Sequence, residues 1–257
     1  MIFLKKHAGY IFIICLTLYY GFGLYLKRAV YPYFFAQKYD MSLEISKQDY
    51  FAPIDDKPFV FLTKKYAYIL VPKVKYAVTA KVGFVDRYDT WFNRFYRGHS
   101  QNFYINLVPQ DILLVIGDMA RDDIFSKFKF EHEERLGRVL CKGVQYKTSF
   151  MSGYLSEEEY LKNKKKYEEC QPYIKSEEYN NYHPIPANAN INRALSILKA
   201  GDVVYLEGIL VDVPDMGLKT GVQKNQYHEN IIVQGIAPGM CFILYTTTVI
   251  LNGHIYQ

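Results

Sequence analysis

Residues with catalytic potential gather in one aromatic-rich segment, Tyr88 to Ser100, which holds the only tryptophan, Trp91. In this segment Arg94 could clamp an anion, and His99 could act as a general base on Ser100. Neighbours in sequence seldom form a nucleophile and base pair, however, and a triad needs a third orienting group and an oxyanion hole. The aromatic side chains recur at three- and four-residue steps, which favours a helix packed onto a sheet. Trp91 and Arg94 are therefore predicted as binding residues, and His99 and Ser100 remain candidates for catalysis.

Two further histidines stand in polar surroundings. His183 opens the sequence HPIPAN and is a third catalytic candidate. It could join His99 as a metal ligand, but no third ligand follows at a diagnostic spacing, so no metal site is predicted. His132 lies among glutamates and lacks the H-E-x-x-H pattern, since Leu136 stands four residues later. A solvated charge cluster is the prediction for His132.

The glycines do not form a nucleotide-binding motif. Neither G-x-x-x-x-G-K-[ST] nor G-x-G-x-x-G occurs, and no cofactor is predicted. The segment 219–226, KTGVQKNQ, is basic and rich in turn-forming residues. It is predicted to be a hairpin loop in which Lys219 and Lys224 contact a partner or lipid headgroups.

The N-terminus contains an uncharged run of 19 residues, Ala8 to Leu26. As a helix it would span about 28 Å, close to the thickness of the hydrocarbon core of a bilayer. Basic residues flank both ends, and no small-residue cleavage site follows, which disfavours a secretory signal peptide. We expect an uncleaved single-pass anchor contacting membrane lipid. The N-terminus is expected in the cytoplasm and the rest of the chain outside it, although the flanking charges nearly balance.

The domain organisation follows from this anchor. Residues 1–28 are the predicted transmembrane anchor, 29–58 a juxtamembrane connector, and 59–257 a single α+β domain. Half of the residues are hydrophobic, so this domain can bury a core. The net charge of +5 is small, and the basic residues are scattered among nearly as many acids, so nucleic acid is not predicted as a partner.

The cysteines leave two possibilities open. Cys15 lies in the anchor, whereas Cys141, Cys170 and Cys241 lie in the domain. An oxidising compartment would allow one disulfide and one free thiol, and a reducing compartment would keep three buried thiols. No C-x-x-C pair occurs, which argues against a zinc ribbon or a thioredoxin-type site.

Hydrophobic patterns predict the elements of the domain. Runs rich in Val, Ile, Tyr and Phe predict strands, whereas capping and charge patterns predict helices. The strands are expected over 59–62, 66–71, 74–85, 111–117, 138–149, 203–214 and 241–251; helices are expected over 155–170 and 191–199, with a short helix running into a strand over 118–130 and an irregular polar stretch over 171–190. The elements do not alternate strictly, which predicts an α+β fold with a mainly antiparallel sheet or small barrel and two or three short helices.

Two resemblances extend this picture. The unit GDVVYLEGILV (201–211) resembles a bent strand of the oligonucleotide/oligosaccharide-binding or SH3-like barrels. YDTWFNRF (88–95), the segment 185–211 and the late cysteine of GMCFILY (239–245) together resemble an uncharacterised group of bacterial proteins with one N-terminal span. That group carries no known activity, so the resemblance implies a bacterial envelope protein and assigns no functional residue.

Three functions remain open. The first is a membrane-tethered, non-enzymatic binding or assembly module with a protein partner in an envelope complex. The second is an envelope hydrolase that uses His99, Ser100 or His183. The third is a nucleic-acid or saccharide binder acting through a barrel-like part of the domain. The sequence favours the first, because no catalytic signature occurs at a recognisable spacing.

Overall fold

The computed structural model describes residues 22–55, 57–88, 102–133, 136–144, 157–224, 231–233 and 241–257. The strands are β1 (Gln37–Lys38), β2 (Tyr50–Pro53), β3 (Phe59–Leu62), β4 (Ala67–Arg87), β5 (Gln110–Val115), β6 (Phe128–Glu133), β7 (Leu136–Cys141), β8 (Tyr179–Pro186), β9 (Val203–Asp212), β10 (Val222–Lys224), β11 (Ile231–Val233), β12 (Cys241–Leu251) and β13 (His254–Tyr256). The helices are a first one over 22–35, then α3 (Asn102–Leu107), α4 (Asp122–Phe125), α5 (Glu157–Cys170) and α6 (Ala189–Ser196).

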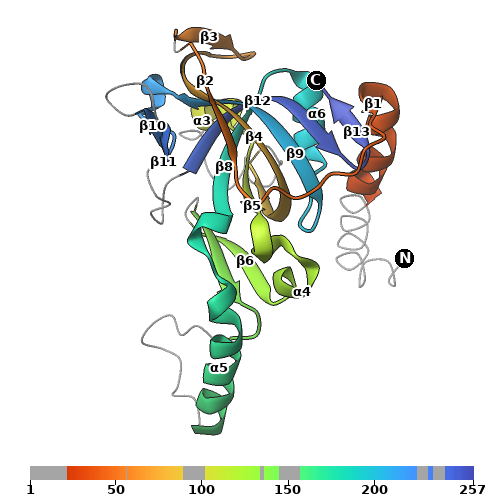
Figure 1. The fold of residues 1–257 in the computed structure, drawn as a ribbon. Coiled ribbons are helices and arrows are strands. Elements are labelled where there is room, and N and C mark those ends of the chain that lie inside the picture. Colours follow the sequence, from red (N-terminus) through yellow and green to blue (C-terminus); the bar gives the residue numbers. More distant parts are fainter. Residues whose placement is uncertain are drawn as a thin grey trace, which may run out of the picture.

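Five strands close into a ring (Figure 1). β4 pairs with β5 and β9, β9 pairs with β12, β12 pairs with β8, and β8 returns to β5. Only the β8–β12 pair is parallel; the other four pairs of the ring are antiparallel. The predicted α+β class with a mainly antiparallel sheet is confirmed.

Side chains from one face of each strand fill the interior of the ring. Side chains alternate between the two faces of a strand, so every second residue points inward. The main cluster inside the ring includes Val78, Ile112, Tyr182, Leu206 and Phe242, each at most 2% exposed. The residues between them point outward, and it is this outer face that carries the candidate site.

β4 is the longest strand, with 21 residues. The sequence predicted two strands here, divided near Pro72. The structure instead shows one continuous strand with register shifts between Pro72 and Val74 and between Val82 and Phe84. Such irregularities bend a strand and increase its twist. The bends allow β4 to pair with β2, β3, β5 and β9 along its length.

Gly208 marks a close approach between β9 and β12. A Cβ at this position would lie 2.0 Å from the backbone oxygen of Tyr245. The register shifts on the facing strand, between Thr246 and Thr248. The backbones of β9 and β12 meet at Gly208, and the irregularity lies on β12 opposite it.

β8 overturns the prediction of an irregular stretch over 171–190. Its residues Asn180 to Ile185 are all buried. Asparagine and proline are both disfavoured in strands, which explains the wrong prediction. Pro184 and Pro186 are tolerated because β8 pairs with β5 only over 179–182, so their missing N–H groups remove no hydrogen bond to β5.

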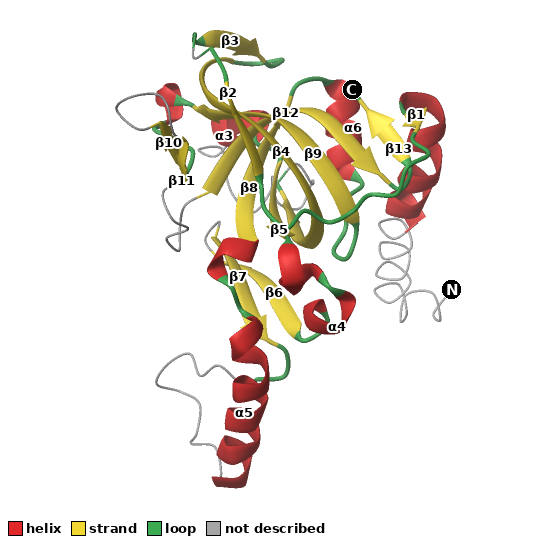
Figure 2. Ribbon diagram, viewed as in Figure 1, coloured by secondary structure: helices red, strands yellow, loops and turns green. Residues whose placement is uncertain are grey.

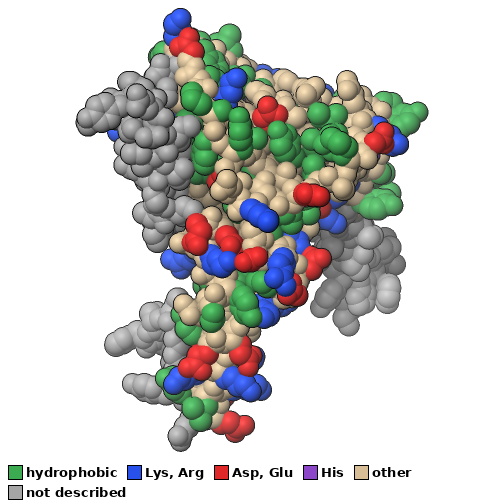
Figure 3. Space-filling view, viewed as in Figure 1, with side chains coloured by type: hydrophobic (Ala, Val, Ile, Leu, Met, Phe, Trp, Pro, Cys, Tyr) green, Lys and Arg blue, Asp and Glu red, His purple; other side chains and the backbone are tan. Residues whose placement is uncertain are grey.

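An insertion of three short 3₁₀ turns, α4, the β6–β7 hairpin and α5 separates β5 from β8 and projects from the ring (Figure 2). A disulfide between Cys141 and Cys170 joins the end of β7 to the end of α5. Acidic and basic side chains cover the α5 projection (Figure 3). The predicted helix over 155–170 is confirmed, and its first turn before Glu157 lies outside the described residues.

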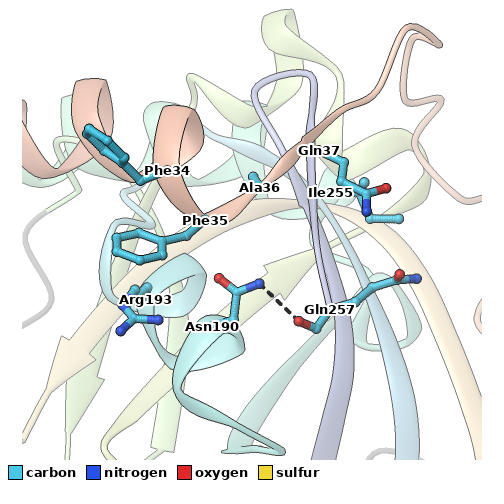
Figure 4. Close-up of a pocket in the computed structure, with 8 residues that line it drawn as sticks. All are labelled: Phe34, Phe35, Ala36, Gln37, Asn190, Arg193, Ile255 and Gln257. Carbon is cyan, nitrogen blue, oxygen red and sulfur yellow. Dashed lines mark hydrogen bonds between the residues drawn. The ribbon is translucent and has the colours of Figure 1, made fainter.

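The segment predicted as a connector takes part in the sheet. β1 pairs with β13, and β2 pairs with β4. An ion pair connects the helix over 22–35 to the ring. The Arg28 guanidinium donates to both carboxylate oxygens of Asp202, at 2.7 and 2.9 Å. The far end of this helix meets α6 and β13, where Arg193 lies 4.0 Å from the centre of the Phe35 ring and lines a hollow of about 400 Å³ (Figure 4).

The predicted membrane span overlaps the described residues only from Phe22 to Leu26. Among the residues that the structure describes, no helix is long and apolar enough to cross a membrane.

Candidate active site

Three neighbouring strands bring a thiol, an imidazole and a carboxylate together. Cys241 is the first residue of β12, His183 lies on β8 and Asp111 lies on β5. Their chain neighbours Phe242, Tyr182 and Ile112 belong to the cluster inside the ring. Since side chains alternate along a strand, Cys241, His183 and Asp111 share the outer face.

His183 links the other two groups. Its Nδ1 lies 2.5 Å from Oδ1 of Asp111, and its imidazole is close enough to Cys241 for the two groups to shift each other's pKa. Asp111 is fully buried and His183 is 5% exposed, whereas Cys241 is partly exposed. The order from surface to interior is therefore thiol, imidazole, carboxylate, which leaves the thiol as the accessible member.

Asn181 adds an amide beside the thiol. Asn181 is the residue of β8 that stands opposite Cys241 in the parallel ladder. Its Nδ2 donates to Sγ of Cys241 at 3.4 Å, and the side chain is buried. An amide donor is thus fixed next to the sulfur atom.

The second oxygen of Asp111 faces two more groups. The buried Tyr88 hydroxyl donates to Oδ2 of Asp111. Nε2 of His132 lies 3.4 Å from the same oxygen, and Nδ1 of His132 lies 2.8 Å from Oδ2 of Asp86. Asp86 stands opposite Asp111 in the β4–β5 ladder, so both carboxylates point to the same side of the sheet.

Charge pairing sets the protonation of the cluster. Burial alone would lower the pKa of His183, but its hydrogen bonds to Asp111 and Cys241 raise that pKa to about 9. Burial likewise raises the pKa of Cys241, yet the hydrogen bonds from His183 and Asn181 outweigh burial and lower it overall. Burial would also raise the pKa of Asp111, which His132, His183 and Tyr88 together hold below its usual value. These opposite shifts both favour a thiolate beside an imidazolium over a neutral thiol beside a neutral imidazole.

This arrangement has a defined chemical capacity. A thiolate is the reactive form of cysteine, and a neighbouring imidazolium both stabilises it and can donate a proton. A buried carboxylate on the far nitrogen of the imidazole fixes the orientation of the ring. Together the three groups can attack an electrophilic carbon and protonate a leaving group.

Of the residues proposed from the sequence, His183 is the one that the structure brings into this cluster. Trp91, Arg94, His99 and Ser100 lie outside the described residues. Lys219 is exposed on the segment between β9 and β10, and Lys224 is the last residue of β10. Neither lysine is placed in the cluster by any contact among the described residues.

His132 corrects a prediction. The sequence assigned it to a solvated charge cluster, but its side chain is only 12% exposed and contacts Asp86 and Asp111. The glutamates beside it in sequence gave no sign of these partners, which come from β4 and β5. Residues in the same strand alternate between faces, so sequence neighbours do not reveal what a buried side chain meets.

Cys241, Asp111 and Asn181 were not predicted as site residues. Each signal was faint: a cysteine opening the last long strand, an aspartate opening a buried strand, and asparagines before His183. These residues span positions 111 to 241, and only the closure of the ring makes them neighbours.

No protein-family model matches this chain, and no curated protein or solved structure matches it. Within the described ranges, no group of three or more His, Cys, Asp or Glu side chains is arranged to hold a metal ion.

Proposed function

We propose that this protein is a cysteine-dependent acyl-transfer enzyme, acting as a hydrolase of an amide, ester or thioester. The observation that supports the proposal is the Cys241–His183–Asp111 chain, in which a partly exposed thiol meets a buried imidazole that is 2.5 Å from a buried carboxylate. Among the functions left open by the sequence this geometry favours the hydrolase, with Cys241 as the nucleophile in place of Ser100.

The reaction follows from the three groups. The Cys241 thiolate attacks the carbonyl carbon, and the carbonyl electrons move to oxygen. When that oxyanion collapses, the bond to the leaving group breaks, and the His183 imidazolium gives the leaving group its proton. Neutral His183 then takes a proton from water, which attacks the thioester and releases the acid and the thiolate.

Asn181 has a place in this scheme. A tetrahedral oxyanion forms one bond away from the attacked carbon, so its stabilising donors must lie close to the nucleophile. The Asn181 amide already lies 3.4 Å from the sulfur atom. We assign it the role of a donor to the oxyanion.

We also propose that the ring is a barrel of the oligonucleotide/oligosaccharide-binding type. Its strands follow the order β4, β5, β8, β12, β9 around the ring, and α6 lies between the third and fourth strands in sequence. Barrels of this type bind ligands on the outer face of their second and third strands and with the loops beside it. Those strands are β5 and β8, which carry Asp111 and His183.

The setting that we propose is the outer side of a membrane. The disulfide between Cys141 and Cys170 supports an oxidising compartment, because such bonds rarely persist in a reducing one. The uncharged run Ala8 to Leu26 supports an anchor. An envelope enzyme held at a membrane surface combines both observations with the thiol site.

A generic activated ester tests the proposed chemistry without knowledge of the natural substrate. The protein is mixed with p-nitrophenyl acetate, nitrophenolate release is followed, and peptide mass spectrometry locates any acetyl group. We expect acetylation at Cys241, followed by turnover. The Cys241→Ala variant should lose the initial burst of nitrophenolate release. The His183→Ala variant should lower the rate of nitrophenolate release by about 10²- to 10⁴-fold, the usual contribution of a general acid or base.

The matched control is the same protein unfolded in urea, in which Cys241 reacts as an ordinary thiol. If the folded chain acetylates Cys241 no faster than the unfolded chain, the enzyme proposal is wrong. A non-enzymatic binding module, the first function considered from the sequence, would then be favoured.

A further inference from the structure

One side chain of the insertion between β5 and β8 lies at the candidate site. His132, on β6, lies between two carboxylates: its Nδ1 is 2.8 Å from Asp86 and its Nε2 is 3.4 Å from Asp111. Its ring also packs 5.2 Å from the Phe84 ring and 6.4 Å from the Tyr88 ring, measured between centres. Packing on two rings and pairing with two carboxylates fix the imidazole in one orientation.

Asp111 is consequently shared by two imidazoles. Oδ1 meets His183, whereas Oδ2 meets Tyr88 and His132. The hydrogen bond from Tyr88 to Oδ2 restrains the carboxylate that orients His183, and Nε2 of His132, which makes no hydrogen bond, adds a charge contact to the same oxygen. His132 does not contact Cys241 and acts on the thiol only through Asp111 and through its charge.

The position of the β6–β7 hairpin against β5 places His132 beside Asp111. Gly137 stands opposite His132 in the hairpin, and a Cβ on it would lie 2.2 Å from a methyl group of Leu113 on β5. A side chain at this position would have to displace the buried Leu113 side chain or move the hairpin away from β5. At the other end of the hairpin, Cys141 pairs with Phe128 and forms the disulfide to α5.

The charged and titratable groups facing His132 come from every element packed against it. Asp86 comes from β4, Tyr88 follows β4, and Asp111 comes from β5. On the hairpin itself, Glu131 is paired opposite Arg138. The cation of His132 is thus placed between two anions and beside the ion pair of Cys241 and His183.

We propose that His132 is a positioning residue of the thiol site, holding Asp111 in place and supplying the positive charge that lets two carboxylates and a thiolate coexist. This inference rests on the proposed function, since it names a second group that the same reaction needs. Burial alone would lower the pKa of His132, and its contacts with Asp111 and Asp86 raise that pKa to about 9, so it carries the charge at neutral pH.

Removing the charge of His132 should shift the pKa values of the neighbouring groups in a predictable direction. Removing a cation makes every nearby group easier to protonate, so the pKa values of Cys241 and His183 must both rise. Coulomb's law in a partly solvated site gives a shift of about half a pH unit or more for a charge acting across one intervening residue. A purely structural role would change stability and leave the pKa of the thiol where it is.

The test is the pH dependence of alkylation of Cys241 by iodoacetamide, read by peptide mass spectrometry in the full chain. The variants are His132→Gln, which removes the charge, and His132→Lys, which keeps a cation. His254→Gln is the matched control, because His254 lies on β13 and contacts the backbone oxygen of Asn252 instead. A urea midpoint for each variant confirms folding, and His132→Asn replaces the glutamine variant if that chain does not fold.

We expect a depressed midpoint in the wild type and in His254→Gln, a midpoint at least about half a unit higher in His132→Gln, and a midpoint in His132→Lys close to the wild type. A wild-type midpoint equal to that of a free thiol would overturn the proposed function itself. A depressed wild-type midpoint that His132→Gln leaves unchanged would overturn the role of His132 alone. A lysine variant that matches the glutamine variant would also contradict it, because the effect would then not depend on charge.

Discussion

Asp111 is the residue around which the candidate site is organised. It is fully buried, yet it meets His183, His132 and Tyr88, so its charge is compensated. A buried carboxylate without such partners would be strongly destabilising. Because three side chains compensate this one buried charge, we infer that the side chains of the site depend on one another.

The two raised histidine pKa values predict how stability changes with pH. Both histidines have folded pKa values of about 9 against ordinary values of 6.5. Their contribution is therefore complete below pH 6.5 and is lost as the pH rises through about 9. Cys241 has a lowered pKa and works in the opposite direction, so it offsets part of the effect of the two histidines.

We expect the free energy of unfolding to fall across that range by at most about 2.7 kcal/mol per pH unit, the limit for two histidines, and by less because Cys241 opposes them and solvent screens His132. Urea unfolding at a series of pH values measures the slope. His183→Gln should flatten it. A wild-type stability that is constant or rises over the same range would show that the histidines are not held as cations.

At the scale of elements, the ring positions the site and the insertion completes it. β5, β8 and β12 supply Asp111, His183 and Cys241, while β6 supplies His132. The hairpin that carries β6 is held against β5 at Gly137, where no Cβ fits. The site thus depends on a contact between two elements and not on a loop.

A single methyl group at this contact should separate the two elements. Gly137→Ala is expected to push the hairpin away from Leu113 and to withdraw His132 from Asp111, since overpacking forces the backbone to move and costs about 1–3 kcal/mol. The thiol midpoint should then rise as in His132→Gln. Gly217→Ala is a control for glycine replacement in general, because a Cβ there meets nothing within 4 Å although its φ is positive. A thiol midpoint that Gly137→Ala leaves unchanged would contradict this view of the hairpin.

The elements also show why the sequence revealed only part of the fold. Strongly patterned segments such as 59–62, 203–214 and 241–251 were predicted as strands and correspond to β3, β9 and β12, with β9 ending two residues early at Asp212. β8 was missed because its asparagines and prolines oppose strand formation, and burial between β5 and β12 outweighs that preference. Because β8 was not predicted, the sequence could name His183 as a candidate but could not place it beside Asp111 and Cys241 or identify Asn181.

At the scale of the whole molecule, the site is assembled from residues that only the closed ring makes neighbours. Asp86 and Cys241 belong to the first and last strands of the ring in sequence. No local motif joins such residues, so spacing could suggest His183 as a candidate but could not name its partners. The N-terminal membrane anchor stays a prediction, because most of the proposed span lies outside the described residues.

The N-terminal helix still links the anchor hypothesis to the fold. Arg28 holds residues 22–35 against the ring through Asp202 and also donates to the backbone oxygen of Ile197 at 2.6 Å. An anchor that continues this helix would hold the ring in a fixed orientation to the membrane. Phe22, Tyr25 and Tyr33 of the same helix are all at least 60% exposed, as expected for side chains near a lipid interface.

The most direct measurement of the central claim is the ultraviolet absorbance of the thiolate as a function of pH, taken as the difference between the wild type and Cys241→Ser. We expect a thiolate signal in the wild type that persists to a lower pH than the signal of an ordinary cysteine, and a signal in His183→Gln that appears only at alkaline pH, because the imidazolium is what stabilises the thiolate. If the wild type shows no thiolate until the pH at which ordinary cysteines ionise, Cys241 and His183 do not form an ion pair, and the proposed enzyme site does not exist.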